Sequence, residues 1–392
     1  MNEEDLRRLL TVAAEDVRPT RPAIFGWDRA RRVRRARWAA GATALAVALI
    51  GGGTTALLHR AGPPPATPAH PTVSPATNGP PVQRPPATLD RTDDPLGRLG
   101  NRVGAPLSAR PVDRALALLQ PINPETGEAG VIRILGDDGM VRKLDVVTLA
   151  PTRDASGNEA VPLKPGSLSP DGRTAAFAQT GEVVVVDLTD AAVRRYPLAG
   201  YLEHVVWAGD RLLVGDNDTT YELDRRTGTA RKLPVDPWGL VVPEPARPGD
   251  LLSLGSAEDL LAVRRFPATG GTPERRPVTS GELPPGYRLN DVYGRGWQRG
   301  NLIAQAGWTT TGSMNGAEGL ALLDARTGAV TRLLDLGRED RAKACCEVLG
   351  WSADGAVLFR YDLGGLARWQ PETGEVAWVA RDVGGLVALP AG

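Results

Sequence analysis

The chain has 392 residues, with 46 basic and 46 acidic residues and a formal net charge of zero. This balance excludes the chain-wide basic surface that nucleic-acid-binding proteins carry, so we expect no nucleic-acid partner. Two adjacent cysteines and three histidines exclude a disulfide framework and the ligand spacing of zinc sites, and they disfavour histidine-based catalysis.

The N-terminal segment, residues 1–37, is predicted to be a short cytoplasmic tail. Leucines recur at helical spacing over residues 3–16, and Pro19 then ends the predicted helix. A basic cluster follows. Its six arginines are Arg29, Arg31, Arg32, Arg34, Arg35 and Arg37.

Residues 38–58 have the sequence WAAGATALAVALIGGGTTALL, which contains no charge. About 20 apolar residues in a helix span the hydrocarbon core of a bilayer. A cleaved signal peptide has a shorter basic region and an apolar stretch of about 7–15 residues, so it fits less well. We therefore expect a single-pass transmembrane helix. The arginine cluster then keeps the N-terminus in the cytoplasm and places the C-terminal domain outside the cell membrane.

Residues 59–107 are predicted to be a disordered, proline-rich extracytoplasmic linker. Twelve prolines fall between residues 62 and 106, mixed with Ala, Thr and Ser. Proline fixes φ and removes the amide donor that sheets and helices need. We expect this linker to form an extended, semi-rigid stalk.

Residues 108–392 are predicted to form an all-β domain, because short β-branched runs alternate with Gly, Asp and Pro turns. One unit, a strand, a tight turn and a second strand, recurs every 38 to 58 residues or so, about the period of propeller blades. Its copies are 131–147, 182–198, 220–235, 260–278, 320–336 and 366–383. In most copies a Gly after Asp or Thr supplies the positive φ of the turn.

A second motif precedes the unit in several copies. It is clearest in Ser169-Pro170-Asp171-Gly172-Arg173, and Ser352-Ala353-Asp354-Gly355 is a variant of it. These residues resemble the WD40-like and TolB-type repeats, although the Gly-His and Trp-Asp signature of true WD40 blades is absent. The resemblance implies a β-propeller, and the six copies predict six four-stranded blades, with seven as the alternative. Ring closure is expected to pair residues 386–390 with residues 115–119.

No catalytic motif is found: the sequence lacks a G-x-S-x-G elbow, an H-E-x-x-H helix and a P-loop. His204, the only histidine of the β domain, is more consistent with a packed or capping side chain than with a catalytic base. Asp216-Asn217-Asp218 offers oxygen ligands, but it lacks the Gly turn and distal Glu of a calcium loop. We therefore expect a non-enzymatic protein without cofactor or metal.

The adjacent Cys345 and Cys346 are the most unusual feature of the sequence. Free thiols rarely persist in an oxidising compartment, so a strained vicinal disulfide is one interpretation. Buried thiols that act as small hydrophobes are the other. We predict the disulfide.

The long loops of the predicted propeller indicate where a ligand would bind. The loops between blades, and between the second and third strands of a blade, emerge on one face. The longest are 148–166, 234–250, 278–290, 308–318 and 337–347. They carry Trp238, Tyr287 and Trp308. Exposed aromatic residues on rigid scaffolds are good binding anchors, although tolerated insertions would look the same.

The sequence thus predicts a membrane-anchored binding module for a protein, glycan or small ligand at the cell envelope. Arginine-rich, Ala-, Gly- and Pro-rich usage is typical of a GC-rich genome such as that of an actinobacterium. The layout resembles that of actinobacterial membrane-bound anti-sigma factors, which implies signalling through residues 1–37, but their His and Cys zinc pattern is missing. A propeller hydrolase or lyase using loop carboxylates is a third hypothesis.

Overall fold

In the computed structural model, the described part of the chain is residues 79–390. It is interrupted at 102, 124, 155–156, 217, 245–248, 258–259, 269–270, 312–313, 338–345 and 362–363. The predicted cytoplasmic tail and the predicted transmembrane helix lie outside the described residues. Within residues 79–390, no helix is long and apolar enough to cross a bilayer.

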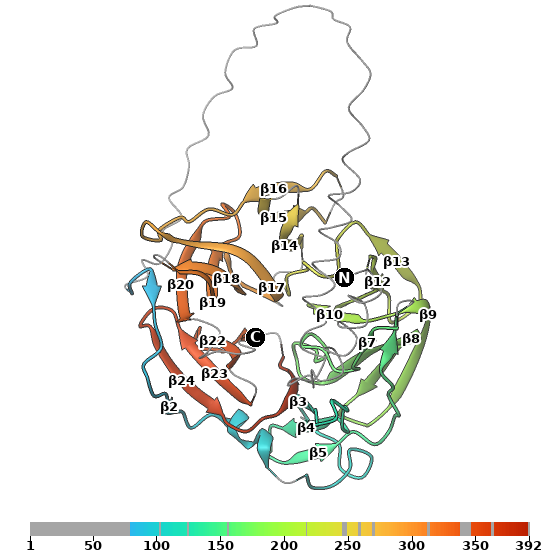
Figure 1. Ribbon diagram of the computed structural model, residues 1–392. Coiled ribbons are helices and arrows are strands. Elements are labelled where there is room, and N and C mark those ends of the chain that lie inside the picture. The colour runs from blue at the N-terminus through green and yellow to red at the C-terminus, as the bar shows by residue number, and fades with distance from the viewer. Residues whose placement is uncertain are drawn as a thin grey trace, which may run out of the picture.

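The strands form sheets arranged around a central axis, which is a β-propeller (Figure 1). Five sheets have three to five strands, and we call them blades I to V. Blade I contains β3 (Ala115–Pro121), β4 (Arg133–Gly136), β5 (Val141–Lys143) and β25 (Gly385–Ala388). Blade II contains β10 (His204–Ala208), β11 (Arg211–Gly215), β12 (Thr220–Leu223) and β13 (Ala230–Leu233). Blade III contains β14 (Leu251–Ala257), β15 (Leu260–Phe266) and β16 (Glu274–Pro277).

Blades IV and V each have a fifth strand from the N-terminal side of the domain. Blade IV contains β17 (Tyr287–Arg299), β18 (Leu302–Thr311), β19 (Met314–Asp324), β20 (Val330–Gly337) and β1 (Val82–Gln83). Blade V contains β21 (Glu347–Trp351), β22 (Val357–Tyr361), β23 (Gly365–Gln370), β24 (Glu375–Ala380) and β2 (Asp90–Arg91). Two hairpins form sheets of their own: β6 (Thr152–Arg153) with β7 (Glu159–Ala160), and β8 (Thr174–Asp187) with β9 (Val193–Tyr201).

The expectation of six or seven four-stranded blades is wrong, because five sheets qualify as blades. The repeat copy at 182–198 does form its hairpin, β8–β9, and this hairpin lies in the ring between blades I and II (Figure 1). However, the residues before β8 meet it through a single bridge, Leu168 to Ala175. An isolated bridge makes no ladder, so this sector has two strands instead of four.

The six predicted hairpins are confirmed as β4–β5, β8–β9, β12–β13, β15–β16, β19–β20 and β23–β24. The residues of each turn explain why the hairpin could be predicted from the sequence. In the β12–β13 turn, the Asp224 carboxylate accepts hydrogen bonds from the backbone N–H groups of Arg226 and Thr227, at 2.8 and 3.3 Å. Gly228 then takes a φ of 75°, which a residue with a Cβ rarely adopts.

Ring closure is also confirmed. β25 pairs antiparallel with β3, and Val387 lies opposite Leu119. The last strand of the chain thereby completes the first blade. The side chains between successive blades form the core, and the largest fully buried ones include Trp207, Trp369 and Phe359.

The predicted linker is wrong for residues 79–107, which we call the strap. The strap wraps around the outside of blades IV, V and I (Figure 1). β1 pairs parallel with β20, β2 pairs parallel with β24, and Pro106 forms a parallel bridge with Lys143 of β5. Between them lies the 3-10 helix η3 (Pro95–Gly100), which begins after Asp94, whose carboxylate accepts from the N–H of Leu96 at 2.9 Å.

The strap packs despite its prolines because it needs few amide donors. An added edge strand can pair on one side only, where proline is tolerated. Its apolar residues supply the driving force: Leu99 and Leu107 are fully buried. Gln83 is buried as well, where its side chain accepts a hydrogen bond from Trp369 Nε1 at 2.6 Å and donates one to the Pro371 carbonyl at 2.8 Å.

Candidate binding site at the loop face

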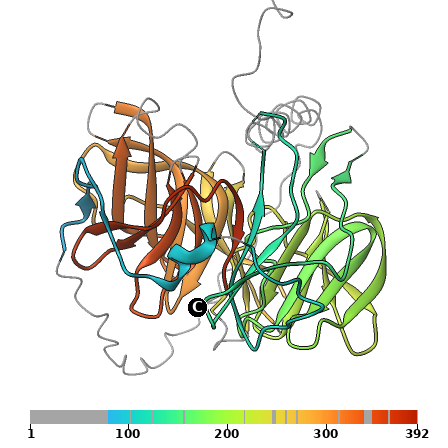
Figure 2. The same cartoon turned by 90° about the horizontal axis from the view of Figure 1, so that it is seen from below.

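One face of the ring carries the connections between blades and the loops between second and third strands. We call it the loop face. Figure 2 shows the β3–β4 loop and the β6–β7 hairpin standing out from the same side of the ring. β17 starts on this face at Tyr287, and β18 ends on it at Thr311.

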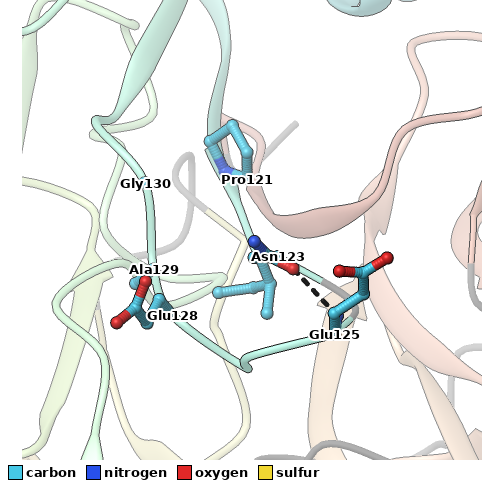
Figure 3. A pocket seen from close by; sticks show the side chains of 7 residues that line it. Pro121, Asn123, Glu125, Glu128, Ala129 and Gly130 are labelled. Carbon is cyan, nitrogen blue, oxygen red and sulfur yellow. Dashed lines mark hydrogen bonds between the residues drawn. The ribbon is translucent and has the colours of Figure 1, made fainter.

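A cavity of about 610 Å³ lies at the β3–β4 loop (Figure 3). It is lined by Pro121, Ile122, Asn123, Glu125, Glu128, Ala129 and Gly130. The Asn123 side-chain oxygen accepts from the N–H of Glu125 at 2.8 Å and fixes the loop. Two exposed carboxylates, those of Glu125 and Glu128, make this hollow acidic. Within the described residues, however, no three His, Cys, Asp or Glu side chains gather to hold a metal ion.

The sequence prediction missed this loop, although a signal for it exists. Pro-Glu-Thr-Gly-Glu occurs at 124–128 and again at 371–375. The second copy is the tight turn between β23 and β24. The first copy closes a similar turn, in which the N–H of Gly127 donates to the Asn123 carbonyl at 2.8 Å. It lies between a second and a third strand, on the loop face.

A buried polar cluster joins blades II and IV around Arg295. The Arg295 guanidinium donates to the carbonyls of Pro237 and Leu240, at 2.9 and 3.4 Å. It also lies 2.9 Å from His204 Nδ1. Because arginine is a donor only, His204 Nδ1 must accept, so the His204 ring is neutral with its proton on Nε2. Trp238 packs edge-on against this ring, with the centroids 4.4 Å apart.

Trp238 is therefore half-buried at the blade II–III connection, and it belongs to the packing of that connection as well as to the loop face. His204 is buried and packed, as its sequence context predicted. Two charged groups lie close by: Glu203 is buried, and its carboxylate is 4.0 Å from the Lys164 ammonium. Local charges of both signs thus meet where blade II begins.

A second cluster surrounds Trp308 on β18. The Trp308 ring lies 5.6 Å from that of Tyr293 on β17, and both side chains are half-buried. Cys346 is buried beneath them, with its sulfur 3.5 Å from the Tyr293 hydroxyl. Cys346 forms no disulfide with another described residue, and Cys345 lies outside the described residues. The vicinal disulfide therefore stays a prediction.

β17 supplies both clusters because it is irregular between them. Its register with β18 shifts between Tyr293 and Trp297, and Gly294 takes a φ of 67°. A bulge re-aims the side chains on either side of it and is common beside functional sites. Here it directs Tyr293 towards Cys346, which directly precedes β21 of blade V, and Arg295 towards the blade II–III connection. The sequence gives Tyr293-Gly294-Arg295, but its pairing register is set only in the sheet.

Tyr287, the third predicted anchor, lies apart from these clusters. Its hydroxyl accepts from the Arg84 guanidinium of the strap at 3.1 Å. Arg84 also binds the buried Asp335 carboxylate at 2.9 Å, and these hydrogen bonds raise the pKa of Arg84. Tyr287 thus holds the strap against blade IV. Asp216 caps a turn: its carboxylate accepts from the N–H groups of Asp218 and Thr219, each at 2.7 Å.

Comparison with known proteins assigns no family. No family model matches the chain, and no curated protein matches it. Solved structures with similarity include TolB from Acinetobacter baumannii, at 15% identity, TM-score 0.45, 70% of this chain and 66% of that one. BamB from Moraxella catarrhalis has 17% identity, TM-score 0.36, and 68% and 76% coverage. An acylaminoacyl peptidase of Pyrococcus horikoshii has 16% identity, TM-score 0.40, and 69% and 45% coverage.

These similarities are too distant to indicate what the chain binds. The propeller is established by its own sheets, whose five blades close through β25. It is a β-propeller in which the S-x-D-G residues form tight turns. The Ser169 hydroxyl donates to the Asp171 carboxylate at 2.6 Å, and Ser352 and Asp354 repeat this contact at 2.5 Å.

Proposed function

We propose that the chain is a binding module for a protein, glycan or small ligand at the cell envelope. A transmembrane helix at 38–58 would hold it in the membrane, with its N-terminus in the cytoplasm and the propeller outside. The observation that carries the binding role is the Tyr293–Trp308 pair. These half-buried rings lie near the loop face on strands fixed by long ladders, whereas Trp207, Trp297, Trp351 and Trp369 are buried between blades.

Aromatic side chains on a rigid support bury a large apolar area at low entropic cost, so they dominate many interfaces. Arg295 and Trp238 extend the same region towards blade II. The binding surface would then run along both sides of β17, from Trp308 to Trp238.

The test measures binding of the purified full chain in detergent to isolated cell envelopes of the producing organism. We expect Trp308→Ala to weaken binding about tenfold or more, the range of an interface hot spot. Leu260→Ala is the matched control, because Leu260 is a 58% exposed apolar residue on another blade, blade III. Equal binding by Trp308→Ala, Trp238→Ala and the unmodified chain would place the site elsewhere.

Topology is tested separately. Protease added to intact spheroplasts should digest a C-terminal epitope tag and spare an N-terminal one. Protection of the C-terminal tag would contradict the proposed orientation.

A signalling role is the second candidate, and the strap favours it. Residues 79–107 contact blades IV, V and I directly, so a change in the ring has a continuous path to the N-terminal segment. Residues 1–37 would then bind a cytoplasmic partner. Co-purification of a partner with the full chain, lost when residues 1–28 are deleted, supports this role. Retention of the partner would contradict it.

A further inference from the structure

The outermost strands of the ring differ in whether the strap covers their outer edges. Three of them are covered by the strap, always in the same way: a short extended segment lies parallel to the outermost strand. The covered strands are β20, β24 and β5. The geometry of this propeller therefore accepts an additional parallel strand at its rim.

The other three outer strands are β9, β13 and β16. Within the described residues, no strand pairs with their outer edges. Each carries two adjacent basic residues at its second and third positions. These are Arg194 and Arg195, Arg231 and Lys232, and Arg275 and Arg276. Together the three strands hold six basic residues and one acidic residue, Glu274.

The covered strands differ in character. β24 has the sequence EVAWVA, and in β20 the side chains of Arg332, Leu333 and Leu334 are buried. In β5, Arg142 is turned inward, where it binds Asp138 at 2.7 Å. The strap accordingly covers two strands without a pair of adjacent basic residues, β20 and β24, and one strand that has such a pair, Arg142 and Lys143 of β5. All three open strands have a basic pair.

Five of the six basic side chains on the open edges are exposed, and Arg275 is half-buried. The Arg231 side chain is 70% exposed, although it also binds Glu222, and Arg195 binds Glu182 in the same manner. Arg194 and Lys232 are exposed and make no ion pair with another described residue. Lysine and arginine on an edge repel a second basic edge, so they select against self-association while leaving the backbone groups available.

We propose that the open edges β9, β13 and β16 dock an acidic, extended segment of a partner protein, which adds a parallel strand as the strap does. Successive side chains of a strand point to opposite faces, so two adjacent acidic residues of the partner would each meet one base of a pair. Backbone hydrogen bonds would supply affinity, and the charges would supply selectivity.

A protein partner fits better than a lipid surface because the open edges offer unpaired backbone groups, which a peptide strand can pair with and lipid headgroups cannot. β2 and β24 lie on one side of the ring, and β9 and β13 lie on the other (Figure 1). The described strap begins at β1 on blade IV, so β16 of the neighbouring blade III lies next to its start, and β9 and β13 lie farther round the ring.

The experiment uses the full chain and a fluorescent peptide of about twelve residues in which pairs of adjacent Glu residues alternate with pairs of Thr, long enough for a typical strand. The variant replaces all six basic residues of the open edges by Thr, which retains strand propensity. We expect the variant to bind the peptide about tenfold or more weakly, the scale of a lost charge-paired contact. Arg173→Thr, at an exposed turn outside the open edges, is the control and should bind as the unmodified chain does.

Two further measurements make the result specific. A second variant with Lys at all five arginine positions keeps the charge and should retain binding, which also shows that loss in the first variant is not misfolding. The same peptide with alternate backbone amides methylated should bind at least tenfold more weakly, because strand pairing needs those amides.

Three outcomes overturn the proposal. Equal affinity for the methylated peptide means that charge alone holds it. Binding to anionic phosphatidylglycerol vesicles that depends on the six bases, without peptide binding, means that the edges face a lipid surface. Self-association of the Thr variant, without any change in peptide affinity, means that the bases serve only to keep open edges apart.

Discussion

The two halves of the rim differ in how their outermost strands are protected from pairing with other chains. An outermost strand exposes unpaired N–H and C=O groups, which invite pairing with other chains. Blades IV, V and I satisfy these groups with the strap, and the apolar side chains of the strap are buried there. Blades II and III and the β8–β9 hairpin leave them open and surround them with arginine and lysine.

The covered half of the rim is therefore completed by the strap, a segment that lies outside the six repeat copies. The strap crosses the junction between blades V and I, where β25 closes the ring. We therefore expect strap contacts to stabilise the domain strongly and the open edges to contribute little. The next three expectations test this difference, beginning with the largest effect.

Leu99→Ala should lower the free energy of unfolding by about 3 kcal/mol, because it empties a fully buried site between η3 and blades V and I. Leu260→Ala, on an open blade and 58% exposed, should change it by less than about 0.5 kcal/mol. Urea denaturation of the two variants measures both values. Equal losses would mean that the covered half is not specially stabilised.

Gln83→Ala should cost about 1–2 kcal/mol, since the buried Trp369 Nε1–H would lose its acceptor. Gln83→Glu keeps an acceptor for the indole but cannot donate to the Pro371 carbonyl. Its free energy of unfolding should therefore lie between that of the unmodified chain and that of the alanine variant. Both are measured by urea denaturation at pH 7. A loss below about 0.3 kcal/mol for the alanine variant would show that β1 is dispensable.

The twin S-x-D-G turns allow the smallest test, by acid. In blade V, hydrogen bonds from Ser352 and the Arg368 guanidinium hold the pKa of Asp354 at about 2, below its usual 3.8. Its folded pKa is depressed, so its contribution is complete above about pH 4 and is lost as the pH falls through about 2. The contribution should stay below about 1 kcal/mol, because the side chain is 54% exposed and solvent screens the pair.

In the open half, burial raises the pKa of Asp171, but hydrogen bonds from Ser169 and the N–H of Arg173 outweigh it and lower the pKa overall. Stability followed from pH 5 to pH 2 should therefore lose less in Asp354→Asn than in the unmodified chain. Asp171→Asn should reduce the loss of stability at low pH to a smaller extent. Its carboxylate forms no ion pair with a described guanidinium, although the nearby charge of Arg173 also lowers its pKa. A larger effect of Asp171→Asn than of Asp354→Asn would show that Arg368 does not cause the difference between the two turns.

The sequence predicted local pairing well and long-range pairing only where a pattern repeats. Each hairpin turn is specified by neighbouring residues, as with Asp224, Thr227 and Gly228. The count of full blades failed because the residues before β8 look like a strand but make one bridge. The strap was mistaken for a stalk because its proline content hides Leu99 and Leu107, whose burial depends on three blades far along the chain.

The sequence predicted individual residues of the candidate site, but it did not predict which of them lie together. Trp238 and Trp308 do lie near the loop face, but Tyr287 instead anchors Arg84 of the strap. Arg295 and Tyr293 were not predicted, since nothing in their local sequence reveals a bulge in β17. Their partners His204 and Cys346 lie 91 and 53 residues away, and only the sheet brings them together.

The sequence by itself therefore determined the β-propeller, its six hairpins and the closure through β25, because these follow from turn chemistry and from a period that recurs along the chain. The tertiary structure alone decided which edges are covered, where β17 bends, and which aromatic rings stay half-exposed. Those features depend on contacts between distant segments, whose burial no local pattern records.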